Sequence, residues 1–396
     1  MRRIESFARR ASNTAKSEEP KKLGAPLRGI KTGAFVIMTL AVLGCDGDVV
    51  TPEGADAAQV PTATVGLRAA QGDLLPIVLS VWQGSDGQAW FSGGGRGEIG
   101  GFIGRTDSAR LVYEPVEEGR TIWWIWGVED RARYAAGEGG RILERMEDGW
   151  RVQYRHTDHR AVFWGGWSSA TGTTWVVGGS HGTRGPKGLL LRRAAGGEWE
   201  SIETSEAGVT GNLFKVWGRD DDDVYMVGED GVALHWDGAT LVRVPTQTEE
   251  LLFTLHGNDA GDVLVVGGTR SAKILRLSGD RFVDDGAPEG QPPLNGVFVQ
   301  PNGGALAVGG RGLVLERDAD GVWSRRRDEV LRGLDRYTLH AVSGAPAVWA
   351  VGGDFSAGRD GLVLTSLAGS MTAALGENKP VLAVPDASAL DAGVLD

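Results

Sequence analysis

The chain has 396 residues, of which 41% are hydrophobic and 23% charged, and it contains 62 glycines, 14 tryptophans and one cysteine. This composition can bury a core, so it excludes a disordered chain, a disulfide scaffold and a protein built of long helices. The net charge of −11 disfavours nonspecific binding to nucleic acid.

The N-terminal segment, residues 1–44, has the pattern of an export signal. Residues 1–31 contain nine Lys or Arg and three acidic residues, and the apolar run 33–44 follows. This run is too short to span a hydrocarbon core as a relaxed helix, whereas a basic flank followed by a short apolar stretch is typical of a secretory signal. We therefore predict that residues 1–44 are a signal peptide.

Cys45 stands directly after this apolar run. The sequence Val42-Leu43-Gly44-Cys45 resembles the bacterial lipobox, in which the cysteine is lipidated and the chain is cut before it. The resemblance implies a lipid-anchored protein of the bacterial cell envelope, in the periplasm or at the outer-membrane surface. An incidental thiol behind an ordinary signal, or a short membrane anchor, are the alternatives. Cleavage would leave 32 basic and 49 acidic residues, a net charge of −17.

Two segments with little strand character flank the rest of the chain. Residues 45–61 are rich in Gly, Pro, Asp and Ala, which predicts a flexible tether. Residues 369–396 are rich in Ala, Asp, Gly and Val without a clear period, and we expect a loosely ordered tail.

Residues 62–368 contain an internal repeat. Its clearest copy, within residues 213–238, reads LFKVWG, DVYMVG and GVALHWDG, and a fourth run follows at 241–244. When this pattern is moved along the chain, the tryptophan position falls at Trp82, Trp126, Trp164, Trp217, His256, Phe298 and Val342. The glycine that ends the second run falls at Gly93, Gly137, Gly178, Gly228, Gly267, Gly309 and Gly352. Both series indicate seven copies of about 43 residues.

The repeat predicts the fold. Its runs are short and rich in Val, Leu, Trp and Tyr, as strands are, and four strands in a repeat of this length are typical of a propeller blade. Because a lone blade exposes both faces, seven blades in a ring bury those faces against their neighbours. We predict an all-β, seven-bladed β-propeller of four-stranded blades. The seventh copy lacks a fourth run, so we expect residues 62–69 to complete the last blade as its outer strand.

The repeats resemble those of secreted and lipid-anchored propeller proteins of myxobacteria and related bacteria, on the pattern VWG, DVYxVG and GxxLHWDG. The resemblance covers residues 62–368 and implies a fold rather than an activity. More distantly, the repeats resemble the seven-bladed propellers of photosystem assembly factors, BNR-type repeats and kelch repeats. The Asp-box of BNR repeats is absent, and the Trp-Asp pair of WD40 repeats occurs once, at Trp236-Asp237.

Arginine recurs in the turns between the second and third runs of the repeat. The residues are Arg96, Arg141, Arg184, Arg270, Arg311 and Arg359. Such turns lie on one face of a propeller, around the mouth of its central channel, so we expect a rim of arginines there. Guanidinium groups bind carboxylate, phosphate or sulfate through paired hydrogen bonds, which predicts a site for an anionic ligand or an acidic peptide. Exposed charge that only aids solubility is the alternative.

Three tryptophans do not fit the repeat pattern. Packing between blades explains the tryptophans that occupy repeat positions, among them Trp90, Trp126, Trp164, Trp175, Trp217 and Trp349. Trp123, Trp124 and Trp167 do not occupy such positions, and we expect them to provide exposed aromatic contacts, for example to a glycan.

The sequence has weak candidates for a metal site, and we expect no metal or other cofactor. His156 and His159 are three residues apart, which places them on opposite faces of a strand, and no third ligand is apparent. The run 220–223 consists of four aspartates, which could hold Ca²⁺. Aspartate is also favoured in turns, so calcium remains the alternative here.

The motifs favour a binding module over an enzyme. The chain contains no H-E-x-x-H motif. We predict a membrane-tethered, non-catalytic monomer that binds an envelope protein, a peptide or a glycan at the channel mouth and does not bind nucleic acid. The alternatives are a hydrolase or lyase acting on an extracellular polymer, and a purely structural lipoprotein. A histidine and a carboxylate close together beside the arginines would favour the enzyme.

Overall fold

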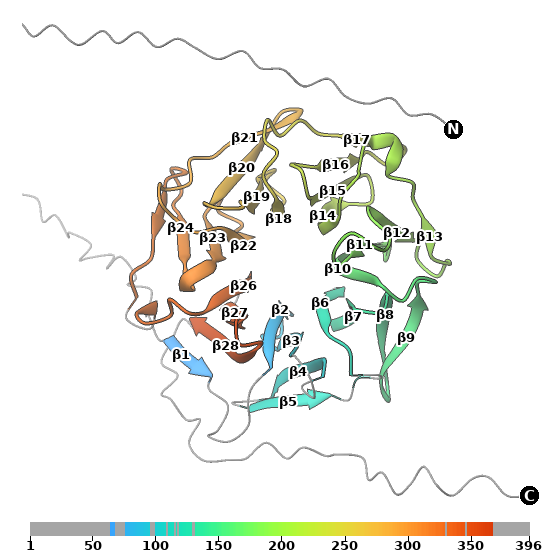
Figure 1. The fold of residues 1–396 in the computed structure, drawn as a ribbon, viewed down its shortest axis with the longest axis horizontal. Coiled ribbons are helices and arrows are strands. Elements are labelled where there is room, and N and C mark those ends of the chain that lie inside the picture. Colours follow the sequence, from blue (N-terminus) through green and yellow to red (C-terminus); the bar gives the residue numbers. More distant parts are fainter. Residues whose placement is uncertain are drawn as a thin grey trace, which may run out of the picture. The chain divides into compact units, whose positions relative to one another are not determined.

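The computed structural model describes residues 64–67, 76–95, 100–107, 110–114, 116, 119–128, 131–328, 331–344 and 347–366. These residues form seven four-stranded antiparallel sheets, with two short 3-10 helices and no α-helix among them. Figure 1 shows the sheets as blades around a central axis, with the first strand of each blade nearest that axis. The predicted seven-bladed propeller is therefore confirmed. The signal segment with Cys45, the tether up to residue 61, Arg96 and the tail 369–396 lie outside the described residues.

The first four blades follow one another along the chain. Blade one contains β2 (Ile77–Gln83), β3 (Ala89–Gly94), β4 (Phe102–Asp107) and β5 (Arg110–Glu114). Blade two contains β6 (Ile122–Val128), β7 (Arg131–Gly137), β8 (Arg141–Met146) and β9 (Gly149–Arg155). Blade three contains β10 (Ala161–Ser168), β11 (Thr174–Ser180), β12 (Leu189–Arg193) and β13 (Glu200–Ser201), and η1 (Ser205–Ala207) follows. Blade four contains β14 (Leu213–Asp220), β15 (Asp223–Gly228), β16 (Ala233–Trp236) and β17 (Leu241–Arg243).

The last three blades complete the ring. Blade five contains β18 (Leu252–Gly257), β19 (Val263–Gly267), β20 (Lys273–Ser278) and β21 (Arg281–Asp284). Blade six contains β22 (Leu294–Val299), β23 (Ala305–Gly309), η2 (Gly310–Gly312), β24 (Val314–Arg317) and β25 (Trp323–Arg325). Blade seven contains β26 (Thr338–Ser343), β27 (Val348–Asp354), β28 (Arg359–Ser366) and, from the start of the chain, β1 (Thr64–Leu67).

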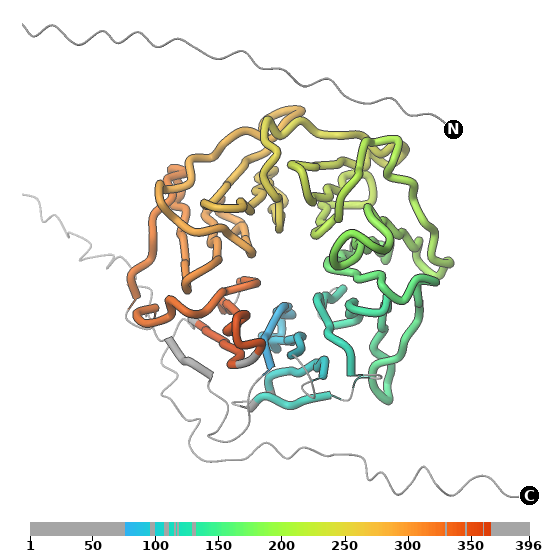
Figure 2. Tube along the Cα trace, viewed as in Figure 1, coloured from blue at the N-terminus to red at the C-terminus, as the bar shows by residue number. Residues whose placement is uncertain are grey.

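Blade seven is assembled from both ends of the propeller sequence. The outer strand β1 pairs antiparallel with β28, with Thr64 opposite Ser366 and Leu67 opposite Val363. Residues 62–69 were predicted to form this outer strand. In Figure 2 the last blade, in red, lies beside blade one, in blue, because the chain runs once around the axis. Pairing of β1 with β28 covers what would otherwise be an open sheet edge.

The hydrophobic core is divided among the contacts between blades. The buried apolar side chains form seven clusters in the described part of the chain, and each joins two neighbouring blades. The cluster between blades three and four, for example, packs Trp175 and Val177 against Val216 and Met226. No blade has a core of its own, so each is stable only between two neighbours.

A β-bulge in every inner strand explains the repeated glycine. In each blade one residue of the inner strand is left out of the pairing with the second strand, and the preceding residue pairs with the repeat glycine. A Cβ atom on any of these seven glycines would lie 1.9–2.2 Å from a backbone carbonyl oxygen at the start of the inner strand or directly before it. No side chain fits at that distance, so the glycine is what allows the two strands to approach at the bulge.

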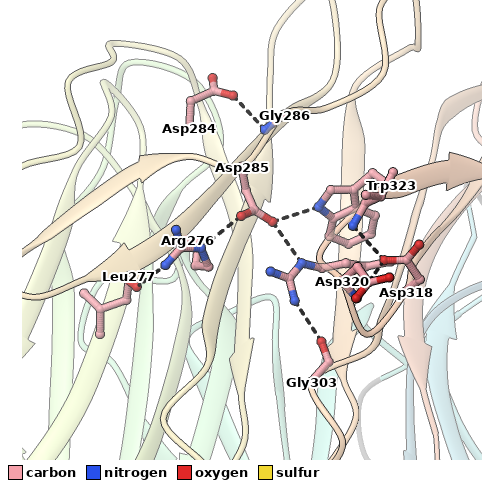
Figure 3. Close-up of polar contacts among 11 residues, drawn as sticks. Arg276, Leu277, Asp284, Asp285, Gly286, Gly303, Asp318, Asp320 and Trp323 are labelled. Carbon is pink, nitrogen blue, oxygen red and sulfur yellow. Dashed lines mark hydrogen bonds and ion pairs between the residues drawn. The ribbon is translucent and has the colours of Figure 1, made fainter.

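Buried carboxylates connect the outer strands of neighbouring blades. Figure 3 shows Asp285, which directly follows β21 of blade five, between Arg276 and Trp323. Its carboxylate accepts hydrogen bonds from Trp323 Nε1 at 2.8 Å and from Arg276 Nε and Arg317 Nε, both at 3.1 Å. Because Arg317 and Trp323 belong to blade six, this network joins two blades through charge-assisted bonds.

The same network recurs between blades one and two. Glu114, the last residue of β5, accepts a hydrogen bond from Trp150 Nε1 at 2.8 Å. Arg105 Nε of blade one and Arg145 Nε of blade two lie 3.2 and 3.4 Å from its carboxylate oxygens. Each of these two contacts between blades thus uses one carboxylate, one indole and two guanidinium groups, and the groups lie on equivalent strands. These networks hold the outer edge of the ring together, where strands are too short to bury much apolar surface.

Candidate functional site

The bulges turn one side chain per blade toward the channel. The bulge residues are Leu79, Trp123, Trp164, Phe214, Phe253, Asn295 and His340. A bulge bends its strand and redirects the extra side chain. All seven lie near the start of the inner strand, so they share the end of the ring that carries the turns between second and third strands. We call this end the channel mouth.

Aromatic rings of the bulge residues meet across the propeller axis. The His340 ring of blade seven lies 5.9 Å from the Trp123 ring of blade two and 5.3 Å from the Phe253 ring of blade five, between centroids. Neither of those blades is next to blade seven, so these contacts cross the channel. Trp164 and Phe214 are 5.2 Å apart, and Phe214 is 5.3 Å from Phe253. Trp123, Trp164, Phe214, Phe253 and His340 form what we call the mouth cluster.

The polar members of the bulge set connect neighbouring blades. His340 Nδ1 donates a hydrogen bond to Leu79 O of blade one at 2.6 Å, and Asn295 Nδ2 donates to Leu339 O of blade seven at 3.2 Å. Burial lowers the pKa of His340 to about 4, so its imidazole is neutral at neutral pH. The mouth cluster is therefore an uncharged, largely apolar surface held in place from several blades.

A histidine and a carboxylate lie close together at the edge of the mouth cluster. His181, in the loop after β11, places its ring 5.9 Å from that of Trp123 and 5.8 Å from that of Trp164. Its Nε2 is 3.5 Å from Glu138 Oε1, and both side chains reach solvent. The hydrogen bond from His181 lowers the pKa of Glu138, which keeps that carboxylate ionised. The mouth thus has an exposed donor and an exposed acceptor beside its rings.

The next residue of each inner strand forms a second layer below the mouth cluster. Lys215 of blade four and Trp124 of blade two belong to it, and Lys215 Nζ lies 2.8 Å from the centre of the Trp124 ring. Trp124 Nε1 donates to Gly166 O of blade three at 3.0 Å. Because blade three separates blades two and four, the lysine side chain reaches across to a blade that is not its neighbour.

The predicted arginine rim is incomplete, and one of its members was wrongly assigned. Arg141 is fully buried, and its guanidinium donates to Glu138 O at 3.0 Å and to Arg120 O at 3.1 Å, so it joins two backbone segments instead of facing solvent. Arg184 and Arg311 are exposed, as expected. The structure describes no side chain for Arg359, and Arg96 lies outside the described residues.

Arg270, also exposed, lines an open groove instead of standing alone in a rim. The groove has a volume of about 1060 Å³, and Arg243, Glu249 and Glu250 line it as well. It lies between the connection from blade four to blade five and the turn after β19. Both signs of charge occur there, so this groove differs from the purely basic rim that the sequence predicted.

The three tryptophans expected to be exposed have three different positions. Trp123 is a half-buried bulge residue of the mouth cluster, and Trp124 lies in the second layer against Lys215. The expectation for Trp167 was wrong: it packs on the cluster between blades three and four. Its pairing with Trp175 matches that of Trp217 with Tyr225, so Trp167 occupies the repeat position.

The internal repeat pattern assigned the repeat position to the wrong residue in two blades. Trp164 was placed there, but it is the bulge residue of blade three, three residues earlier. In blade seven the position belongs to Ser343, opposite Trp349, and not to Val342. The mouth cluster could have been identified from one signal: an aromatic residue at the second position of the inner strand, as in Trp123, Phe214 and Phe253.

Three of the four aspartates at 220–223 make contacts within the protein. Asp221 Oδ2 accepts a hydrogen bond from Thr171, Asp220 Oδ1 accepts from the backbone of the turn, and Asp223 pairs with Arg219 and His235. No group of three or more His, Cys, Asp or Glu suited to a metal occurs among the residues that the structure describes.

Among the described residues, no helix has the length and apolar character needed to cross a membrane.

No protein-family profile and no curated protein sequence matches this chain, but solved structures do. The chain is similar to an inactive variant of virginiamycin B lyase from Staphylococcus aureus, solved with quinupristin, at 8% identity and a TM-score of 0.60, over 77% of this chain and 100% of that one. The extracellular domain of BT4673 from B. thetaiotaomicron matches at 14% identity and a TM-score of 0.56, over 78% of this chain and 40% of that one. This chain is a β-propeller protein.

A third match agrees with this assignment. The WD40 propeller domain of Doa1 is 10% identical, with a TM-score of 0.56, over 77% of this chain and 96% of that domain. At such low identities the similarity concerns the fold alone. Function depends on the side chains that this propeller carries.

Proposed function

We propose that this protein is a non-catalytic binding module, exported and anchored through Cys45, whose ligand docks on the mouth cluster. The observation that carries the proposal is the convergence of Trp123, Trp164, Phe214, Phe253 and His340 from five blades on one end of the channel. Apolar rings with a few polar groups beside them are typical of ligand sites. Trp123, Phe214 and Phe253 keep part of their surface exposed.

The residues around the cluster favour a saccharide as the ligand. The flat faces of Trp and Phe suit the C–H face of a sugar ring, while His181 and Glu138 provide a donor and an acceptor for its hydroxyls. Arg184 lies on the same loop as His181 and is exposed, which favours a saccharide that carries an acidic group.

The fold itself provides substitutions that test this proposal. Leucine and asparagine occupy the bulge position in blades one and six, so Trp123→Leu with Phe253→Asn should be accommodated. We expect this double variant to bind its saccharide about thirtyfold more weakly or worse, since loss of a central aromatic contact commonly costs about 1–2 kcal/mol. The measurement is an array of defined oligosaccharides and peptides, followed by titration of each hit.

The matched control is Trp199→Leu. Trp199 is also half-buried, but it lies on the outer side of blade three against Tyr154. Its replacement should leave binding unchanged. Equal binding by the double variant and the wild type would contradict the proposal, and hits confined to peptides would replace the saccharide by a peptide ligand.

The pair of His181 and Glu138 at the mouth supports a second candidate function. A histidine and a carboxylate 3.5 Å apart beside a candidate binding surface satisfy the criterion that favours a hydrolase or lyase. His181→Gln separates the two candidates. If the protein is an enzyme, this variant should bind the oligosaccharide and fail to release products from it, as measured by chromatography. If the wild type releases none either, the binding module stands.

A further inference from the structure

We propose that Lys215 is a reactive amine that forms an imine with a small aldehyde or ketone inside the propeller channel. The proposal does not depend on a saccharide at the mouth, because it concerns the second layer. Lys215 lies on β14, and its side chain crosses from blade four to the ring of Trp124 in blade two. It keeps 5% of its surface exposed, so we restrict the proposal to a small carbonyl compound.

The surroundings of Lys215 explain why its amine would react. It forms no hydrogen bond or ion pair with any residue that the structure describes, and burial lowers its pKa well below 10.5. The face of Trp124 attracts an ammonium group, but contact with one ring compensates for only part of the cost of burying that charge. The amine therefore carries a free electron pair in a larger fraction of molecules at neutral pH than an ordinary lysine.

The nearby titratable group does not oppose this state. His340, whose charge would act on Lys215, has a pKa of about 4 and is neutral at neutral pH. The remaining residues of the second layer are Ser80, Gly165, Thr254, Gly296 and Ala341, none of which is ionisable. Lys215 and Trp124 are thus the two large side chains of this layer.

The other two lysines of the described propeller provide an internal comparison. Lys187 Nζ donates to Ser180 O at 3.3 Å and to Asn212 Oδ1 at 3.1 Å, and Lys273 Nζ lies 2.5 Å from Asp284 Oδ2. Both have oxygen partners that stabilise the ammonium form, which has no electron pair to donate.

The reaction is balanced without any further reagent. The neutral amine of Lys215 attacks the carbonyl carbon and forms a carbinolamine, with the amine proton passing to the carbonyl oxygen. Loss of one water then gives the imine. No oxidation or reduction occurs, so the protein and the carbonyl compound are the only reactants.

The test is reductive trapping of the full-length folded protein. Acetaldehyde is added with cyanoborohydride at neutral pH, and peptide mapping by mass spectrometry measures ethylation at Lys187, Lys215 and Lys273. We expect Lys215 to react at least about tenfold faster than the other two, since each pKa unit changes the neutral fraction tenfold. Its rate should reach a plateau well below pH 10. In denaturant the three lysines should react equally.

Two further results decide the proposal. Equal or slower reaction of Lys215 in the folded protein, or a rate that still rises at pH 10, would overturn it. Lys215→Met should abolish trapping at this position while the unfolding free energy stays close to that of the wild type, because a neutral amine without a partner contributes little stability. A large loss of stability in this variant would instead show a structural ammonium group, and would overturn the proposal as well.

Discussion

Gly309→Ala is expected to destabilise the propeller by about 3 kcal/mol or more. The added Cβ would lie 2.2 Å from Pro293 O and 2.9 Å from Leu294 Cα, and both are backbone atoms that cannot turn away. The strand would have to lose its bulge or move away from β23. Denaturant unfolding followed by circular dichroism measures the loss.

The adjacent residue is the control for this prediction. An alanine Cβ at Gly310 would meet Pro292 Cβ at 3.4 Å, which is an ordinary contact. Gly310→Ala should therefore change the unfolding free energy by less than about 1 kcal/mol. Similar losses in the two variants would show that chain flexibility, and not the space at the bulge, explains the repeated glycine.

Asp285→Asn is expected to cost about 2–4 kcal/mol of unfolding free energy, because it leaves two arginines without their counter-charge. The side chains of Asp285 and Arg317 are only 8% and 11% exposed, so water cannot replace the lost charge there. Arg276 is more exposed and contributes less to the loss. An amide has one acceptor oxygen, so either the hydrogen bond from Arg276 to Oδ1 or those from Trp323 and Arg317 to Oδ2 are lost too.

The control for Asp285 is an ion pair of the same kind at the surface. Asp280 pairs with Arg281 at 3.0 Å, and both side chains are more than half exposed. Asp280→Asn should change stability by less than about 0.5 kcal/mol. If Asp285→Asn costs no more than this, the network in Figure 3 does not hold blades five and six together.

The repeat was readable in the sequence because it follows from local chemistry. Val, Leu and Trp in short runs between glycine turns predicted strands, and the seven glycines from Gly93 to Gly352 marked the same structural position in every blade. Each of these residues makes its contacts within its own blade or with the next one, so the pattern is repeated along the chain.

The candidate site was only partly predictable. Trp123 was singled out, but for an exposed contact and not as one ring of a cluster. Trp164 was assigned to the repeat position and Trp167 was not; the structure exchanges these positions, although Trp164 is buried and Trp167 half-buried. Gly166 stands where the other blades have Val, Ile or Leu, and this difference obscured the extra bulge residue in the strand.

Arg141 and Lys215 show why residue type alone was not enough. Arg141 shares its turn position with exposed arginines, yet two backbone carbonyls bind its guanidinium in the interior. Lys215 stands within an otherwise apolar strand, and the sequence does not show that its amine lies over Trp124, 91 positions earlier in the chain.

The sequence by itself determined the number of blades, their four strands and the glycine at each bulge, because these depend on neighbouring residues and on steric limits of the backbone. Only the tertiary structure decided which side chains meet at the channel, which arginines are exposed and which carboxylates connect blades. Those contacts join residues from blades that are distant in the sequence, and the closure of the ring sets their distances.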